Sequence, residues 1–128
     1  MAMTESQDTH KLCMTLTAAG AKCISLVASQ MQEPGLPDRL VVHELFFGFI
    51  EAKRAVGNVS VIQDVKIRQL VERGAPVLLA WYGDRLVTLH CVNSGQQVEI
   101  SRETALSGKR LDGIALLHEM QLLVLTKH

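Results

Sequence analysis

The sequence has no excess of charge of either sign. Its 128 residues include 13 Lys plus Arg and 13 Asp plus Glu, so the formal net charge is zero. A neutral chain has no overall field that would attract nucleic acid or an anionic membrane surface. Binding of either kind would need a local cluster of charge.

Long hydrophobic runs are also missing. No stretch approaches the ~20 apolar residues that cross a bilayer, and the longest candidate, Leu40 to Ile50, is interrupted by His43 and Glu44. The first eight residues lack the basic start and apolar run of a secretory signal. We therefore expect a cytoplasmic protein that does not associate with membranes.

Cysteine is scarce and shows no metal or redox spacing. Cys13, Cys23 and Cys91 are odd in number and form no CxxC motif. This usage is typical of free thiols in a reducing compartment rather than of a disulfide framework.

Composition is otherwise that of an ordinary globular chain, with 48% hydrophobic and 20% charged residues. The length suits one domain with one core, and no linker or repeat divides it. The predicted organisation is a flexible tail over residues 1–7 and a single domain over 8–128.

The first predicted helix runs from about Asp8 to Gln32 and ends before Pro34. It has a 4-3-4-3 seam of apolar residues typical of a helix packed along another helix: Leu12, Leu16, Ala19, Cys23 and Leu26. Small residues at 18–21 would let a neighbouring backbone approach closely. The seam predicts packing within the chain, with a dimer seam as the alternative.

A second predicted helix runs from Asp38 to about Val56 and is apolar on most sides. Its narrow polar stripe contains Glu44, Glu51 and Arg54, with Phe47 on the same stripe. Such a helix is either central in the core or partly covered by a second chain. A strand over 41–50 is the other interpretation, but the lack of alternation and the length favour a helix.

A capping-box pattern at 60–63 predicts a third helix, which ends at Arg73 before Gly74 and Pro76. Alternation and turn residues then predict strands over 77–82, 85–92 and 97–101. Residues 102–113 are expected to be loop or a short helix, and 121–126 a buried strand. The predicted fold is α+β, with three N-terminal helices packed on one face of a mostly antiparallel sheet of four to five strands.

Motifs for catalysis, metals and cofactors are lacking. His43-Glu44 and His118-Glu119 begin like a zincin motif, but neither has a second histidine four residues on. Adjacent His90 and Cys91 would point to opposite faces of a strand. Neither a nucleophile elbow nor a phosphate-binding glycine loop is present. We predict no catalytic residues, no metal and no cofactor.

A nucleic-acid-binding regulator is the alternative function, because three helices followed by a hairpin is the order of a winged-helix module. The third helix and the wing would then supply the contacts, from Gln63, Lys66, Arg68, Gln69, Arg73 and Arg85. The apolar character of 77–82 is a poor fit to an exposed wing.

The favoured prediction is a non-catalytic protein-interaction module of the adaptor, chaperone or inhibitor type, acting as a homodimer. It is based on the surplus of apolar surface and on the aromatic pair beside the turn at 83–84. The residues predicted for the partner or dimer interface are Leu16, Cys23, Phe47, Glu51, Arg54, Trp81 and Tyr82.

Overall fold

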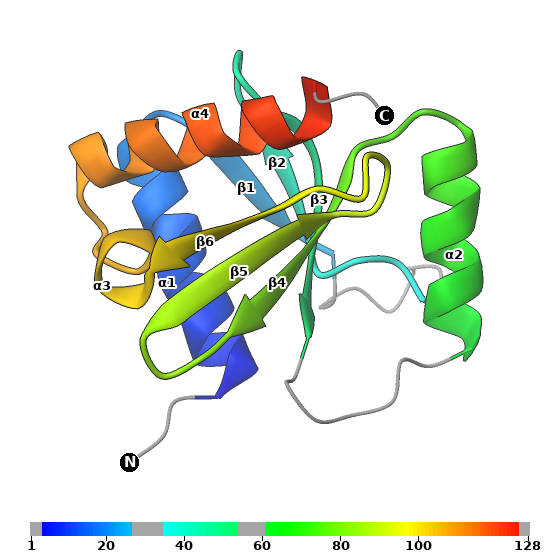
Figure 1. The fold of residues 1–128 in the computed structure, drawn as a ribbon, viewed down its shortest axis with the longest axis horizontal. Coiled ribbons are helices and arrows are strands. Elements are labelled where there is room, and N and C mark those ends of the chain that lie inside the picture. The colour runs from blue at the N-terminus through cyan, green and yellow to red at the C-terminus, as the bar shows by residue number, and fades with distance from the viewer. Residues whose placement is uncertain (1–3, 27–34, 54–60, 126–128) are drawn as a thin grey trace.

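The protein is an α+β fold built on one six-stranded mixed sheet (Figure 1). A computed structural model describes residues 4–26, 35–53 and 61–125. Its elements in chain order are α1 (Glu5–Ala18), β1 (Lys22–Ser25), β2 (Arg39–Val42), β3 (Phe47–Lys53), α2 (Val61–Glu72), β4 (Val77–Tyr82), β5 (Leu86–Cys91), β6 (Gln97–Ser101), α3 (Arg102–Ala105) and α4 (Arg110–Leu125).

The strands lie in the sheet in the same order as in the sequence. Neighbouring strands are antiparallel except β3 and β4, which are parallel. A parallel pair cannot be joined by a tight turn, and the connection here contains α2. The sheet therefore places β1 and β6 at its two edges.

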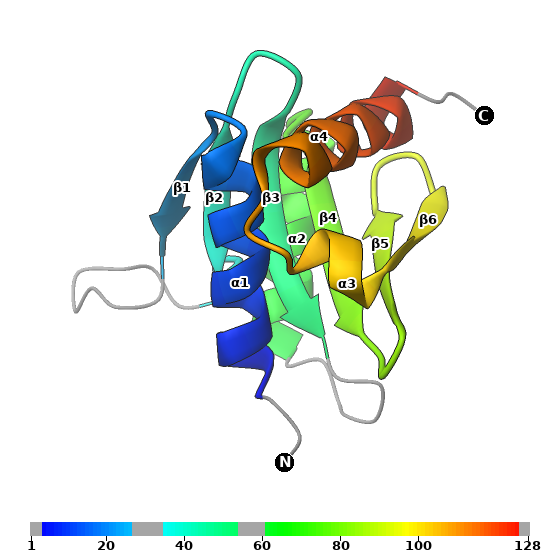
Figure 2. The ribbon, with the colours of Figure 1, turned by 90° about the vertical axis from the view of Figure 1, so that its left-hand side faces the viewer.

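The helices are divided unequally between the two faces of the sheet. Figure 2 shows α1 and α4 on the near side of the strands and α2 behind them. The core lies under α1 and α4, where strand residues such as Ile50 and Leu89 meet Leu12, Leu16 and Leu117, all 0% exposed. Full burial of such side chains stabilises the fold by about 1.5–3 kcal/mol each.

The two large helices cross at a glycine. A Cβ on Gly113 of α4 would lie 2.1 Å from the backbone oxygen of Thr15 and 2.8 Å from the Cβ of Ala19, which caps α1. The small-residue segment therefore does receive a neighbouring backbone, that of α4. The prediction of packing within the chain is supported at this crossing.

The first helix is much shorter than predicted. It begins at Glu5, inside the segment predicted as a tail, with Thr4 and Gln7 forming a capping box. It ends at Ala18 because Gly20 adopts a positive φ of 98° and the N–H of Ala21 bonds back to the Leu16 oxygen. Cys23, placed on the helix by the predicted seam, lies instead in β1.

The predicted second helix is wrong, because that segment forms β2 and β3. A tight turn joins them, in which the N–H of His43 bonds the Phe46 oxygen at 3.0 Å and the reverse bond is 3.2 Å. The apolar run shows no alternation because β3 is a central strand with both faces largely covered. Gly48 is needed where β3 passes the Pro76 backbone, since a Cβ there would lie 2.7 Å from its oxygen.

The predicted strand over 121–126 is also wrong, since α4 extends to Leu125. Its buried residues, Gly113, Leu116, Leu117, Met120 and Leu123, have helical spacing. The short continuous apolar run at 122–125 is typical of a buried strand, and the helical spacing is clear only over the whole of α4.

The remaining elements agree with the sequence prediction: α2, β4, β5 and β6 lie within one or two residues of their expected positions. The predicted fold as a whole is nevertheless wrong, because one helix, not three, precedes a sheet of six strands. Within the described ranges, no helix combines the length and the apolar content that spanning a membrane would take.

Candidate functional site

The strongest candidate site is the part of the sheet beside α2 that no described helix covers. Strand alternation points Leu78 and Ala80 of β4 into the core, so Leu79 and Trp81 face the other way. Their partners on β5 are His90 and Thr88. We call Leu79, Trp81, Thr88 and His90 the uncovered patch; each is partly exposed.

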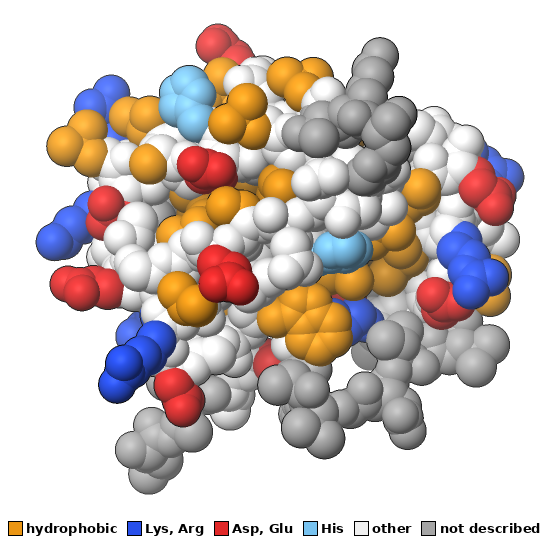
Figure 3. Space-filling model, in the orientation of Figure 1, with side chains coloured by type: hydrophobic (Ala, Val, Ile, Leu, Met, Phe, Trp, Pro, Cys, Tyr) orange, Lys and Arg blue, Asp and Glu red, His pale blue; other side chains and the backbone are white. Residues whose placement is uncertain are grey.

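Figure 3 looks onto this side of the molecule and shows hydrophobic side chains gathered around a histidine, between the strands and α2. The rim is polar and carries both signs of charge. Asp84 and Arg85 lie in the exposed β4–β5 turn, and Glu99, the partner of Thr88 on β6, is also exposed. An apolar centre with a polar rim is the usual arrangement of a protein-binding surface.

The residues predicted for the interface are not brought together. Register places Phe47 two positions before the Phe49–Val77 pair and Trp81 at the Lys53 pair, so the two side chains lie ~20 Å apart along the strands. Phe47 is 61% exposed and Trp81 is half-buried. Trp81 therefore belongs to the uncovered patch and Phe47 does not.

Four other predicted interface residues are held inside the chain. Leu16 is 0% exposed in the core, and Tyr82 packs against the same core with its hydroxyl 3.0 Å from the Thr9 hydroxyl. Cys23 faces the core side of β1, and Glu51 is 3% exposed. The remaining one, Arg54, lies outside the described residues.

Glu51 belongs to a buried polar cluster between β3 and α2. Its carboxylate accepts the backbone N–H of Asp38 at 3.0 Å and a hydrogen bond from the Gln63 amide, and lies 3.6 Å from the Lys53 ammonium. Burial is the main cause that raises the pKa of Glu51 to about 8, and the nearby Asp38 carboxylate is the second cause. The Lys53 ammonium opposes that rise. Gln63 attaches α2 to the sheet, because its side-chain amide donates to Glu51 and accepts a hydrogen bond from Lys53, both on β3.

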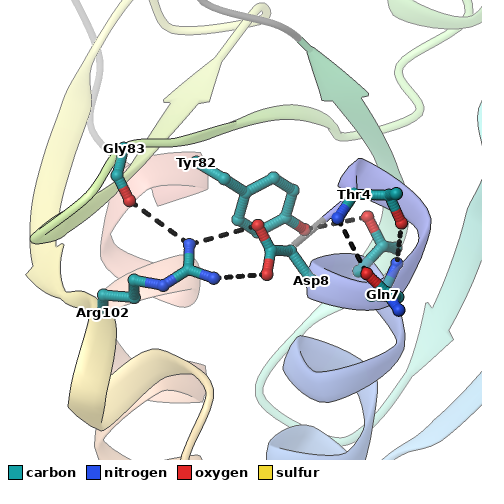
Figure 4. A network of polar contacts seen from close by, with 7 residues as sticks. Thr4, Gln7, Asp8, Tyr82, Gly83 and Arg102 are labelled. Atoms are coloured by element: carbon teal, nitrogen blue, oxygen red, sulfur yellow. Dashed lines mark hydrogen bonds and ion pairs between the residues drawn. The ribbon is translucent and has the colours of Figure 1, made fainter. Parts of the chain in front are cut away.

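A second polar network joins the start of α1 to the far end of the sheet (Figure 4). The Arg102 guanidinium binds both Asp8 carboxylate oxygens, at 2.5 and 3.1 Å, and donates to the Gly83 oxygen at 3.2 Å. The hydrogen bond to Asp8 raises the pKa of Arg102. Burial raises the pKa of Tyr82, which therefore remains a neutral hydrogen-bonding partner of Thr9.

An open groove of 530 Å³ lies beside this network. Its lining mixes cations with carboxylates: Lys11, Arg85 and Arg102 with Asp84 and Glu103, besides Ser101 and Leu106. Because both signs of charge line the groove, it favours neither an anionic nor a cationic ligand. The Asp8–Arg102 ion pair instead links α1 to α3.

The residues predicted for nucleic-acid binding lie mainly on α2. Gln63 is held in the Glu51 cluster, and Arg68 pairs with Asp64 at 2.9 Å one turn earlier. Lys66, Gln69 and Arg73 line a small 120 Å³ hollow with Leu36 and Leu70. The order of three helices followed by a hairpin, which suggested a winged-helix module, is absent from this fold because strands precede α2.

Sequence reasoning missed three of the four residues of the uncovered patch: Leu79, Thr88 and His90. Strand alternation could have placed them on the face of Trp81, because β4 and β5 were both expected. What could not be seen was that α1 and α4 would pack on the other face of the sheet and α2 on this one.

Nowhere in the described ranges do three or more His, Cys, Asp or Glu side chains gather as a metal site. In the comparisons with known proteins, no protein-family model matches the chain and no curated protein is significantly similar to it.

Proposed function

We propose that the protein is a non-catalytic protein-interaction module whose uncovered patch binds a second copy of the same chain. The observation that carries this proposal is Trp81, a half-buried aromatic residue near the end of β4, in the part of the sheet beside α2. Tryptophan is among the residues that contribute most to binding energy at protein interfaces.

The charges around the patch suit a second copy. The chain has 13 basic and 13 acidic residues, so two copies meet without net repulsion. Arg85, Asp84 and Glu99 place both signs on the rim. A two-fold axis through the patch would let Arg85 of each copy meet an acidic rim residue of the other copy.

The test uses Thr88→Arg, because Thr88 lies opposite Trp81 and points away from the core. The long cation would block the patch without disturbing packing inside the chain. Leu111→Arg is the matched control, since Leu111 is 76% exposed and lies on α4, whereas the patch lies on β4 and β5. Circular dichroism checks that both variants fold.

Sedimentation velocity at micromolar concentration should give a dimer for the wild type and for Leu111→Arg. Thr88→Arg should dissociate at least about tenfold more readily, which is about 1.4 kcal/mol of binding energy. Trp81 is the only tryptophan of the chain, so its emission should shift to longer wavelength as the dimer dissociates on dilution. A wild-type monomer, or a Thr88→Arg dimer of unchanged affinity, would contradict the proposal.

A further inference from the structure

Two of the three cysteines lie against each other although ten positions separate them in the sequence. Cys13 is on the buried side of α1 at 8% exposure, and Cys23 is half-buried on the edge strand β1. The Cys23 thiol donates a hydrogen bond to the Cys13 backbone oxygen, with 3.8 Å between sulfur and oxygen. The two thiols are also near enough to shift each other's pKa.

The two thiols have unequal surroundings. The hydrogen bond from Cys13 lowers the pKa of Cys23, and the Thr17 hydroxyl and Arg39 guanidinium lower it further, against the effect of burial. That same hydrogen bond and burial raise the pKa of Cys13. Cys23 is therefore the thiol that ionises, and it is also the more exposed of the two.

The third cysteine provides an internal comparison. Cys91 is 0% exposed in the central part of the core, and its thiol is 3.8 Å from the Asn93 side-chain oxygen. It lies on β5, whereas the pair joins α1 and β1. An oxidant that enters from solvent reaches Cys23 and not Cys91.

From this juxtaposition we propose that Cys13 and Cys23 form a reversible dithiol site, which a hydroperoxide oxidises to a disulfide between α1 and β1. In the first step the Cys23 thiolate attacks a peroxide oxygen. An S–O bond forms, the O–O bond breaks, and the leaving group, which is hydroxide from hydrogen peroxide or an alkoxide from an alkyl hydroperoxide, takes the proton that Cys23 gave up.

In the second step the Cys13 sulfur attacks the Cys23 sulfenic acid. The S–S bond forms, the S–O bond breaks, and the hydroxide leaves as water with the Cys13 proton. The two thiols together lose two electrons and the peroxide gains them. A dithiol reductant reverses the reaction by thiol–disulfide exchange.

The disulfide would close a short loop across the turn at Gly20 and tie the edge strand to the helix. A cross-link of this kind reduces the freedom of the unfolded chain. The oxidised protein should therefore unfold at a higher urea concentration than the reduced protein.

The experiment treats the full-length reduced chain with a small excess of hydrogen peroxide and measures intact mass, free thiols and linked peptides. We expect a mass decrease of about 2 Da, a fall from three free thiols to one in denaturant, and a peptide linking Cys13 to Cys23. Dithiothreitol should restore all three.

Four variants test which cysteines form the disulfide and which of them is oxidised first. Cys91→Ser should form the same disulfide as the wild type, whereas Cys23→Ser should form none. Cys13→Ser should accumulate a sulfenic acid on Cys23 that dimedone traps, and Arg39→Gln should slow oxidation several-fold while leaving the product unchanged. The wild type by itself can overturn the proposal. It does so if three thiols survive peroxide treatment, or if the disulfide includes Cys91.

Discussion

The face of the sheet under α1 and α4 and the face beside α2 are built from different side chains. The first is a layer of aliphatic residues at 0–1% exposure, such as Leu12, Leu116 and Leu117. The second has α2 attached partly through the Glu51 cluster, and Trp81 is half-buried on this face.

The two faces therefore differ in how completely they are covered. Close packing under α1 and α4 is sufficient for a single core, because burial of aliphatic side chains is the main source of stability. The other face is covered less completely, and Leu79 and Trp81 stay partly exposed on it.

Leu16→Ala should have the largest effect and tests the first face. Because Leu16 is 0% exposed and the helix crossing around it cannot collapse into the space, we expect a loss of about 3 kcal/mol in the free energy of unfolding. Urea denaturation measures it. Leu111→Ala, at an exposed site on α4, is the control and should change the free energy of unfolding by less than about 0.5 kcal/mol. If both variants lost the same free energy of unfolding, the distinction between core and surface would be contradicted.

Glu51→Gln tests the polar attachment of α2 through pH. The folded pKa of about 8 lies above the ordinary value of 4.5, so the folded state holds a proton that the unfolded state releases. Stability from this group is present at low pH and is lost as pH rises from about 4.5 toward 8, with a slope of at most about 1.4 kcal/mol per pH unit.

The glutamine variant should lose that slope in urea unfolding at pH 5.5, 6.5 and 7.5, and become relatively more stable at the upper end. Glu99→Gln, which removes an exposed carboxylate on β6, serves as the control and should keep the slope. A variant with the wild-type pH dependence would show that Glu51 is ionised in the folded protein.

Arg68→Ala should have the smallest effect. The pair with Asp64 lies on the outer side of α2, with side chains 72% and 49% exposed. Exposed pairs one helical turn apart contribute about 0.3–0.5 kcal/mol, and salt screens them. A loss above about 1 kcal/mol in urea denaturation would mean that α2 is attached more tightly than its contacts indicate.

Several elements could be predicted because their signals are local. Helix α2 has polar and apolar residues at helical spacing and a glycine after its end, and β4 and β5 flank a short turn at 83–84. Such features need only near neighbours in the sequence. The same local signals placed Trp81 in a strand next to the turn, where the structure has it half-buried.

The sequence by itself therefore determined the later helix, the strands that follow it, and the division of the chain into apolar and polar segments. Only the tertiary structure decided that residues 39–53 are strands, because β3 gains its hydrogen bonds from β2 and from β4, beyond residue 76. It also decided that α4 continues to Leu125, that Cys13 meets Cys23, and that Leu79 and Trp81 stay partly exposed beside α2. These outcomes depend on contacts between distant residues, and no local pattern contains them.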